Sequence, residues 1–366
     1  MAKQLPLAEL HGANGAVFSE RDGWSLPLHF GSPAAEHEAV RSRMGLMDLS
    51  HRAILKFTGP DRLPYLQGMI SNDMRDLAPG QGLYATILNQ QGKVLGDIRV
   101  FCTAEYVLLD LWEWIKEKIL GHLNRYLVAD DVEIADITED YGLISVQGPQ
   151  CEPFLQKLLT QAACPKDPLS HSAVRLDGSE IRLIRYSHTG EEGFDCLTPR
   201  SDLLQVAQRF TETARAFSAG WLGEQAAEVL RVEAGIPRYG VDFTEESLLL
   251  ETGLDHAVSF TKGCYLGQEI VERIHSRGHV NRKLTGLLLY GEREARSRDR
   301  VNAGDKEAGI ITSSVNSPTL KRPIALGYIH KDYWAPGTVL SIDRGGNPIR
   351  GTVSALPFLS ARAGPA

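Results

Sequence analysis

The sequence predicts a mixed α+β region followed by a separate all-β domain. Through roughly the first 280 residues, strand-like alternation repeatedly gives way to apolar residues at helical spacing. After about residue 282 no helical pattern follows, and short apolar runs are separated by Gly, Pro and Asn. A chain of 366 residues is also longer than one ordinary core, so we expect domains at 1–280 and 281–366.

The first half of the mixed region contains several predicted strands, two of which form a hairpin. Alternating residues predict strands at 52–57, 82–88, 93–101, 105–111, 131–137 and 141–147. The hairpin turns at Asn89-Gln90-Gln91-Gly92. Gly59-Pro60 opens a short helix, because proline suits the first helical turn. Residues 113–127 carry an apolar stripe at helical spacing and predict an amphipathic helix, and Gly148-Pro149 starts the next.

The second half repeats this pattern before the β domain begins. Strands are expected at 180–186 and 193–197, and helices at 201–217 and 222–234. The second helix should stop at Gly235, since glycine favours a helix end. The all-β part predicts strands at 284–290, 308–312, 324–329, 338–342 and 349–354. Between the first two of these, the polar segment 291–308 is expected to be an exposed loop.

Composition excludes several classes of function. The net charge of −7 argues against nucleic-acid binding, because there is no overall basic field. No apolar run approaches the ~18 residues of a membrane span, and the N-terminus lacks a signal-peptide pattern, so we expect a cytoplasmic protein. The five cysteines are scattered and form no CxxC pair. They therefore predict neither a disulfide framework nor a metal or iron–sulfur ligand set.

One cysteine lies in a distinctive segment, Lys262-Gly263-Cys264-Tyr265-Leu266-Gly267-Gln268-Glu269. Apolar residues spaced four apart continue from Leu266, so Cys264 is expected near a helix N-terminus. The helix dipole and the ammonium of Lys262 would favour a thiolate there, which indicates a reactive thiol. The alternative is a small, half-buried and inert cysteine in a tight turn.

Motifs spread along most of the chain point to a known family. They are Asp22-Gly23-Trp24-Ser25-Leu26-Pro27-Leu28, Asp48-Leu49-Ser50-His51, Asn72-Asp73, Val146-Gln147-Gly148-Pro149, Thr189-Gly190-Glu191, Leu230-Arg231-Val232-Glu233-Ala234-Gly235 and Ser317-Pro318-Thr319. In these motifs, taken together and in order, the chain resembles the superfamily of the glycine-cleavage T-protein, an aminomethyltransferase that uses tetrahydrofolate. The resemblance implies a three-part cloverleaf, with two α+β subdomains, a C-terminal β-barrel domain and tetrahydrofolate in a central channel.

The segment 262–269 departs from the T-protein version of that pattern. It is similar to the Lys-Gly-Cys-Tyr-x-Gly-Gln-Glu signature of the YgfZ-type folate-binding proteins, relatives implicated in iron–sulfur cluster assembly or repair and in tRNA modification. Arg273, His275, His279 and Arg282 continue this likeness. The resemblance implies that Cys264 is functional, and that iron–sulfur client or assembly proteins are partners.

The resemblance also implies roles for residues of a folate site. Asp97 occupies the position of the family's catalytic acid, within Gly96-Asp97 in place of an acidic pair. Strand alternation puts Asp97 on the face of Arg99, whereas Gly96 points the other way. Glu191 matches the carboxylate that binds the pterin ring. Tyr84 matches a position that lines the site. Lys262 completes the candidate cofactor-binding residues, and Asp97 and Cys264 are the candidate catalytic ones.

Each of these residues has a structural alternative. Asp97 could pair with Arg99 or another cation on a sheet edge, Glu191 could be a carboxylate in a hairpin turn, and Tyr84 could be a cross-strand core aromatic. Two departures weigh against the T-protein reaction. Ala227 stands where T-proteins carry a cationic folate contact, and Leu111 stands where they tend to have Asn. Losing both polar groups makes the full reaction less favoured, yet leaves folate binding in place.

Three hypotheses follow from the sequence. The first is a tetrahydrofolate-binding YgfZ-like protein that supports iron–sulfur enzymes through Cys264. The alternative is a folate-dependent aminomethyltransferase, the T-protein itself or a related demethylase, acting through Asp97 and Glu191. The third is a non-enzymatic adaptor whose pocket has decayed. Reduced folate is the expected ligand of the first two, with no membrane association and no resident metal.

Overall fold

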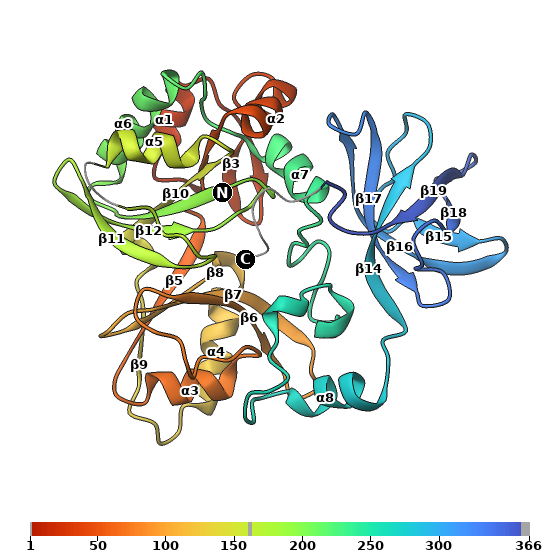
Figure 1. The fold of residues 1–366 in the computed structure, drawn as a ribbon, viewed down its shortest axis with the longest axis horizontal. Coiled ribbons are helices and arrows are strands. Elements are labelled where there is room, and N and C mark those ends of the chain that lie inside the picture. The colour runs from red at the N-terminus through yellow and green to blue at the C-terminus, as the bar shows by residue number, and fades with distance from the viewer. Residues whose placement is uncertain (1, 160–162, 360–366) are drawn as a thin grey trace.

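The computed structural model describes residues 2–159 and 163–359. Figure 1 shows two large sheets with their helices forming one lobe and a β-barrel forming another, with helix α7 (Glu224–Glu233) between them. The predicted class, α+β followed by a β-barrel, is confirmed. Within the described residues, none of the helices is long and apolar enough to cross a membrane.

The first large sheet is antiparallel and contains the predicted hairpin. Its strands run in the order β6-β7-β8-β5-β9. Their bounds are β5 Arg52–Thr58, β6 Gly82–Leu88, β7 Val94–Cys102, β8 Val107–Trp112 and β9 Glu133–Asp136. Helices α3 (Arg62–Met69) and α4 (Lys116–Tyr126), the latter preceded by the short turn η1 (Glu113–Ile115), accompany this sheet. The amphipathic helix expected at 113–127 therefore forms, with a 3₁₀ first turn.

Helix α4 covers one face of this sheet, and a glycine on β7 allows it to approach. A Cβ added at Gly96 would lie 2.5 Å from the Cδ1 atom of Ile115 and 3.4 Å from that of Ile119. The side of β7 that carries Gly96 therefore faces the helix. Since neighbouring residues of a strand point to opposite faces, Asp97 points the other way, as the sequence predicts.

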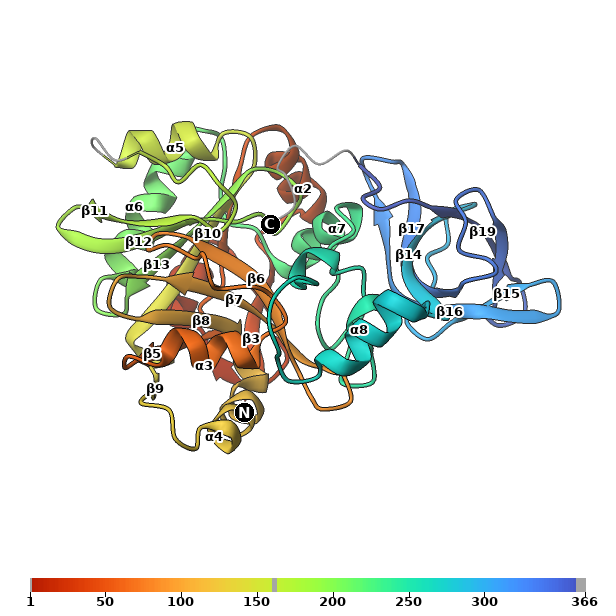
Figure 2. The same cartoon turned by 60° about the horizontal axis from the view of Figure 1, so that its bottom comes forward.

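The second large sheet packs in the same lobe and faces the first, as both views of the ribbon show (Figures 1 and 2). Its order is β11-β12-β13-β10-β4. The bounds are β4 Gly45–Asp48, β10 Tyr141–Gln147, β11 His171–Leu176, β12 Ser179–Arg185 and β13 Gly193–Pro199. Helices α5 (Cys151–Leu158) and α6 (Leu203–Arg215) cover its outer face with apolar residues such as Phe154 and Phe210.

The N-terminal segment adds a small sheet and two helices for which the sequence carried no clear pattern. The elements are β1 Lys3–Gln4, β2 Val17–Arg21, β3 Trp24–His29, α1 Ala8–Ala13 and α2 Pro33–Ser42. The start of helix α2 is stabilised by its own residues, because the Ser32 hydroxyl accepts a hydrogen bond from the Ala35 amide and Pro33 occupies the first turn.

The C-terminal barrel is closed, in the order β14-β17-β16-β15-β18-β19. Its strands are β14 Arg282–Leu289, β15 Arg300–Ala303, β16 Lys306–Ser317, β17 Arg322–His330, β18 Val339–Ile342 and β19 Ile349–Ser354. The prediction of a loop at 291–308 is wrong in part, because β15 and the start of β16 fall inside it. β15 was missed because only Val301 of its four residues is buried, too few to make an alternating pattern.

The helix expected to begin near Cys264 begins later. Helix α8 spans Gln268–Arg277, after Gly267, whose φ is 86°. A helix cannot continue back through a left-handed residue, and the backbone of Gly267 packs against the Asn89 carbonyl of the β6–β7 turn. Cys264 therefore lies in the loop before α8. The short turns η2 Thr138–Asp140, η3 Leu249–Glu251 and η4 Asp255–Ala257 complete the described elements.

Candidate functional site

Two of the predicted site residues meet at a cavity between the large sheets and α7. Tyr84 on β6 and Asp97 on β7 are both 7% exposed, and the tyrosine hydroxyl donates to Asp97 Oδ2 at 2.6 Å. The structural alternative for Asp97, an ion pair with Arg99, is not what the structure shows. Tyr84 combines its two predicted positions, because it contacts Asp97 across the hairpin and also lines the cavity.

The second carboxylate oxygen of Asp97 is the open acceptor of this cavity. Asp97 Oδ1 is buried, lines the cavity and has no hydrogen-bond partner in the described part of the chain. Burial raises the pKa of Asp97, against the opposing effect of the Tyr84 hydroxyl and the Arg52 guanidinium. A buried acceptor without a partner is costly, so this oxygen is suited to a donor brought by a ligand.

Aromatic and cationic side chains form the rest of the cavity wall. The cavity volume is about 100 Å³. The lining residues are Met47, Leu49, His51, Arg52, Tyr84, Asp97, Arg99, Trp112, Tyr186, His188, Glu224, Ala227, Glu228, Arg231, Ile236, Pro237 and Arg238. The guanidinium carbons of Arg52 and Arg238 lie 4.5 and 4.8 Å from the ring of Trp112. Flat rings and guanidinium planes of this kind can receive a planar ligand.

A chain of buried ion pairs supports this wall from behind. Arg99, 1% exposed, donates to both Asp110 and Asp195, and Arg52 donates to the other oxygen of Asp110. His188 lies 3.1 Å from both oxygens of Asp195. Although burial opposes it, the neighbouring His188 and Arg99 hold the pKa of Asp195 below its ordinary value. The wall is therefore charged but internally neutralised.

His51 stands out in the same wall because it is buried without a partner at one nitrogen. Burial lowers the pKa of His51 to about 4, so its ring is neutral near pH 7. Its Nδ1 atom is buried and has no partner among the described residues. The family motif Asp48-Leu49-Ser50-His51 thus ends inside the cavity, directly before Arg52. Sequence reasoning quoted this motif but did not include His51 among the site residues.

Several arginines line the cavity together with Ala227, the position that lacks a cation. Ala227 does line the cavity, but so do Arg52, Arg231 and Arg238. Sequence reasoning quoted Arg231 only within a family motif, and it missed Arg52 and Arg238, which lie on β5 and in the loop after α7. Leu111, the second departure, is fully buried in the core, and its neighbour Asp110 is the residue that reaches the ion pairs.

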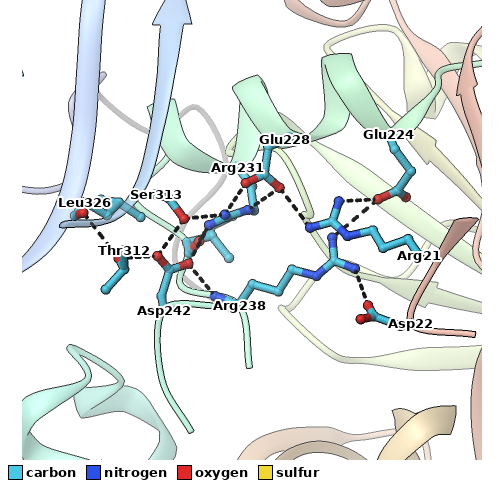
Figure 3. Close-up of polar contacts among 11 residues, drawn as sticks. Arg21, Asp22, Glu224, Glu228, Arg231, Arg238, Asp242, Thr312, Ser313 and Leu326 are labelled. Carbon is cyan, nitrogen blue, oxygen red and sulfur yellow. Dashed lines mark hydrogen bonds and ion pairs between the residues drawn. The ribbon is translucent and has the colours of Figure 1, made fainter. Parts of the chain in front are cut away.

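A polar network ties the α7 side of the cavity to the barrel (Figure 3). Arg231 of α7 pairs with Glu228 and with Asp242 at 2.7 Å. Asp242 accepts from the hydroxyls of Thr312 and Ser313 at 2.5 and 2.7 Å. These two residues lie at the bulge of β16, which turns both hydroxyls toward one carboxylate.

The same network continues from α7 to the N-terminal hairpin. Arg21 pairs with Glu224 at 2.8 Å, and Arg238 pairs with Glu224 and Asp22, each at 3.3 Å. Figure 3 shows these side chains in one row along α7. Three modules of the fold therefore hold the cationic edge of the cavity in place.

The structure places Glu191 in a second node rather than in the cavity wall. Arg41 of α2 donates to Glu191 at 2.9 Å and to Glu233 at 2.6 Å. Glu233 also accepts from His37 and from Ser317 of the barrel. The family motifs around Glu191, Glu233 and Ser317 thus meet at one junction of α2, α7 and the barrel. Glu191 is not among the residues that line the cavity.

Lys262 and Cys264 also lie away from the cavity. The Lys262 ammonium donates to the carbonyl oxygens of Gln67, Ile70 and Asn72 at 2.6–2.7 Å, at the C-terminal end of α3. Burial lowers the pKa of Lys262 to about 8. Cys264 is exposed, so the expectation of a half-buried position for it is wrong. Of the five predicted site residues, only Tyr84 and Asp97 come together.

Two family models match the chain in sequence. The model of the GCVT N-terminal domain covers residues 7–262, and that of the glycine cleavage T-protein C-terminal barrel domain covers residues 282–359. Among relatives, an aminomethyltransferase of Rubrobacter xylanophilus is 35% identical over 357 residues, which cover 97% of this chain and 94% of the relative. One from Saccharopolyspora erythraea is 32% identical over 364 residues, covering 99% of each.

A solved structure has the same fold over nearly the whole chain. The glycine cleavage system aminomethyltransferase T from Bartonella henselae superposes with a TM-score of 0.90 at 24% identity, covering 99% of both chains. Both α+β subdomains and the barrel are therefore arranged as in that protein.

Proposed function

Because this chain belongs to the family of the glycine cleavage T-protein, we propose that it is a folate-dependent aminomethyltransferase with Asp97 as its working carboxylate. The relatives named above are called aminomethyltransferases and match end to end. This supports the alternative hypothesis from the sequence better than the iron–sulfur one. The observation that carries the proposal is the unpartnered Oδ1 of Asp97 in the cavity wall.

The residues of the cavity fit a reduced pterin ring. Asp97 Oδ1 accepts a hydrogen bond from a ring N–H, while the Tyr84 hydroxyl holds the other oxygen in place. Trp112 and Tyr186 add aromatic surface to the wall, with the guanidinium carbons of Arg52 and Arg99 lying 4.5 and 4.4 Å from their rings. The cavity volume of about 100 Å³ is below the ~300 Å³ at which ligand pockets begin, so lining side chains must shift to admit the ring.

Asp97 can also help the transfer itself. A bound reduced folate supplies ring nitrogens that accept the one-carbon unit. A carboxylate beside the reacting centre stabilises positive charge that develops there, and does so strongly in a water-poor site. The raised pKa of Asp97 additionally suits it to hold or return a proton at Oδ2 or Oδ1. His51, neutral and buried, adds an uncharged polar contact at the same wall.

The test is a product assay with purified protein, tetrahydrofolate and an aminomethyl-lipoyl carrier protein. We expect methylenetetrahydrofolate to form, and Asp97→Asn to lower kcat by about 10²-fold or more, since the amide keeps the shape and removes the charge. Asp305→Asn, an exposed barrel residue, is the matched control and should leave kcat unchanged. Absence of product with wild-type protein would refute the transferase.

Calorimetry separates the transferase from an adaptor with a decayed pocket. Wild-type protein titrated with tetrahydrofolate should release binding heat, and Asp97→Asn should bind more weakly because Oδ1 loses its charge. An adaptor shows no binding heat with either protein.

A second candidate function is support of iron–sulfur enzymes through Cys264, as the YgfZ resemblance implies. The observation that favours it is the exposed thiol on the loop of the 262–269 signature. A YgfZ-deficient bacterium carrying this chain should recover, and Cys264→Ala should abolish the recovery. Ser276→Ala, an exposed change on the adjoining helix α8, is the control. Full rescue by Cys264→Ala would exclude the thiol role.

A further inference from the structure

A second cavity lies between the two large sheets, at the other end of the layer from the folate-site candidate. It measures about 190 Å³ and is lined by Lys56, Tyr106, Leu108, Ile137, Tyr141, Ala173, Glu180, Ile181, Arg182, Leu197 and Pro199. None of these residues lines the central cavity. It is therefore a separate space with its own wall.

Strand register explains why two cavities share one layer. On β5, Arg52 and Lys56 are four residues apart and so point to the same face. Arg52 lies opposite Trp112 of β8, at the central cavity, whereas Lys56 lies opposite Leu108, at the second one. The buried ion pairs of Arg99 close the layer between them.

Two cations reach the second cavity without an acidic partner. Arg182 donates to the Tyr106 hydroxyl and to Nδ1 of His171, each at 2.9 Å. Burial lowers the pKa of His171 to about 4, so this partner is neutral. The Lys56 ammonium lies 4.8 Å from the ring of Tyr106. Neither cation forms an ion pair with a carboxylate anywhere in residues 2–159 or 163–359.

Uncompensated cations in a half-buried space favour an anion. Lys56 and Arg182 are both only partly exposed, so water screens their charges less than it would on open surface. Glu180 is the acidic residue of the lining, but it is exposed, so water screens its charge more strongly. The charge balance inside the cavity is therefore positive.

The remaining wall favours a flat apolar group. Tyr106 and Tyr141 supply aromatic surface, and Leu108, Ile181 and Leu197 supply aliphatic surface. The volume is below the ~300–1,000 Å³ of drug-sized ligand pockets, which limits the ligand to about one ring. We propose that this cavity binds a small anion built on a single aromatic ring, whose carboxylate or phosphate contacts Lys56 and Arg182 while the ring lies against the tyrosines.

Four probes of graded chemistry test the proposal. Benzoate and phenyl phosphate carry both the ring and the charge, benzyl alcohol lacks the charge, and inorganic phosphate lacks the ring. Binding to the full-length protein is followed by ligand-observed NMR and calorimetry. We expect one or both ring anions to bind at least about tenfold more tightly than benzyl alcohol and inorganic phosphate, with an affinity that falls as salt is added. The stronger of the two identifies the head group.

Variants of the lining residues locate the bound probe. Lys56→Met and Arg182→Met should each weaken the ring anion by about tenfold or more. Glu180→Gln, which removes the exposed acid of the lining, should leave the affinity for the ring anion equal or raise it about twofold. Melting curves check that each variant folds. If Arg182→Met does not fold, the affinity of Lys56→Met for the ring anion decides by itself whether the probe binds in this cavity.

Three results would overturn the proposal. The first is that neither ring anion binds. The second is that Lys56→Met binds it as tightly as the wild type. The third is that saturating tetrahydrofolate displaces it, which would place the probe in the central cavity.

Discussion

The Arg99→Met variant removes the guanidinium that joins two buried carboxylates across the layer between the large sheets. Arg99 is 1% exposed, and its partners Asp110 and Asp195 are 1% and 0% exposed. Methionine is of similar length and can fill the apolar part of the site, so the main loss is the charge. Asp110 keeps Arg52 and Asp195 keeps His188, but each loses one charge-assisted hydrogen bond.

The expected cost follows from this burial. Removing one member of a buried pair costs about 3–5 kcal/mol, because a charge is left without full compensation. For a folding unit of this size, 1 kcal/mol moves the melting temperature by roughly 2–4 °C, so a decrease on the order of 10 °C is expected. An exposed pair, by contrast, is worth under about 1 kcal/mol.

The stability lost in Arg99→Met should also depend on pH. The folded-state pKa of Asp195 lies below its ordinary value. Its contribution is therefore present above the unfolded pKa of about 3.9 and is lost as pH falls below it. Without Arg99 the folded pKa of Asp195 rises, and protonation relieves the buried charge at higher pH. The difference between wild type and variant should be largest near pH 7 and should narrow toward pH 4.5.

The assay is thermal unfolding by circular dichroism at pH 7 and pH 4.5. The control is Arg209→Met, since Arg209 and its partner Asp177 are both 48% exposed and 3.3 Å apart. The reasoning is refuted if Arg99→Met melts within a few degrees of Arg209→Met at pH 7, or if its deficit grows as the pH is lowered.

Three further substitutions test how the fold holds the site. Gly96→Ala should lower the free energy of unfolding by about 1–3 kcal/mol, because the added Cβ meets Ile115 Cδ1. Ile115→Val removes that atom, so urea unfolding should show that the double variant loses less stability than the two single variants lose together. Asp242→Asn should weaken the link between α7 and the barrel by about 3 kcal/mol and speed proteolysis at their junction, whereas Asp305→Asn, exposed on the barrel, should not; equal proteolysis of both would count against the link. Lys262→Met should lower the melting temperature by several degrees, since three backbone carbonyls lose an ammonium donor; an unchanged temperature would contradict this structural role.

Local pattern predicted much of the fold because it encodes which face of an element is buried. The hairpin of β6 and β7, the helix over 113–127 and the helix that ends before Gly235 all agree with the structure to within a few residues. Asp97 was placed on the correct face of β7 by alternation alone. β15 escaped because four residues with a single buried side chain carry too little periodicity.

The candidate site was predicted only where its residues are neighbours in one hairpin. Tyr84 and Asp97 are joined across β6 and β7, a pairing that short-range sequence can indicate. Glu191 and Lys262 were chosen from motifs, and their partners lie 150 and 190–195 residues away. Whether such a side chain faces a ligand or another part of the chain depends on those distant partners.

Residues close together in the chain were enough to indicate the fold class, the family, most helices and strands between residues 52 and 234, and the face of β7 that carries Asp97. These depend on periodicity and on motifs that lie within one segment. The folded structure was needed to show that arginines of β5, α7 and the following loop line one cavity, that Glu191 joins Arg41 at a junction between modules, and that Cys264 precedes its helix. Each of these depends on contacts between segments far apart in the chain, and the energy of a buried charge is set by those contacts rather than by its neighbours in sequence.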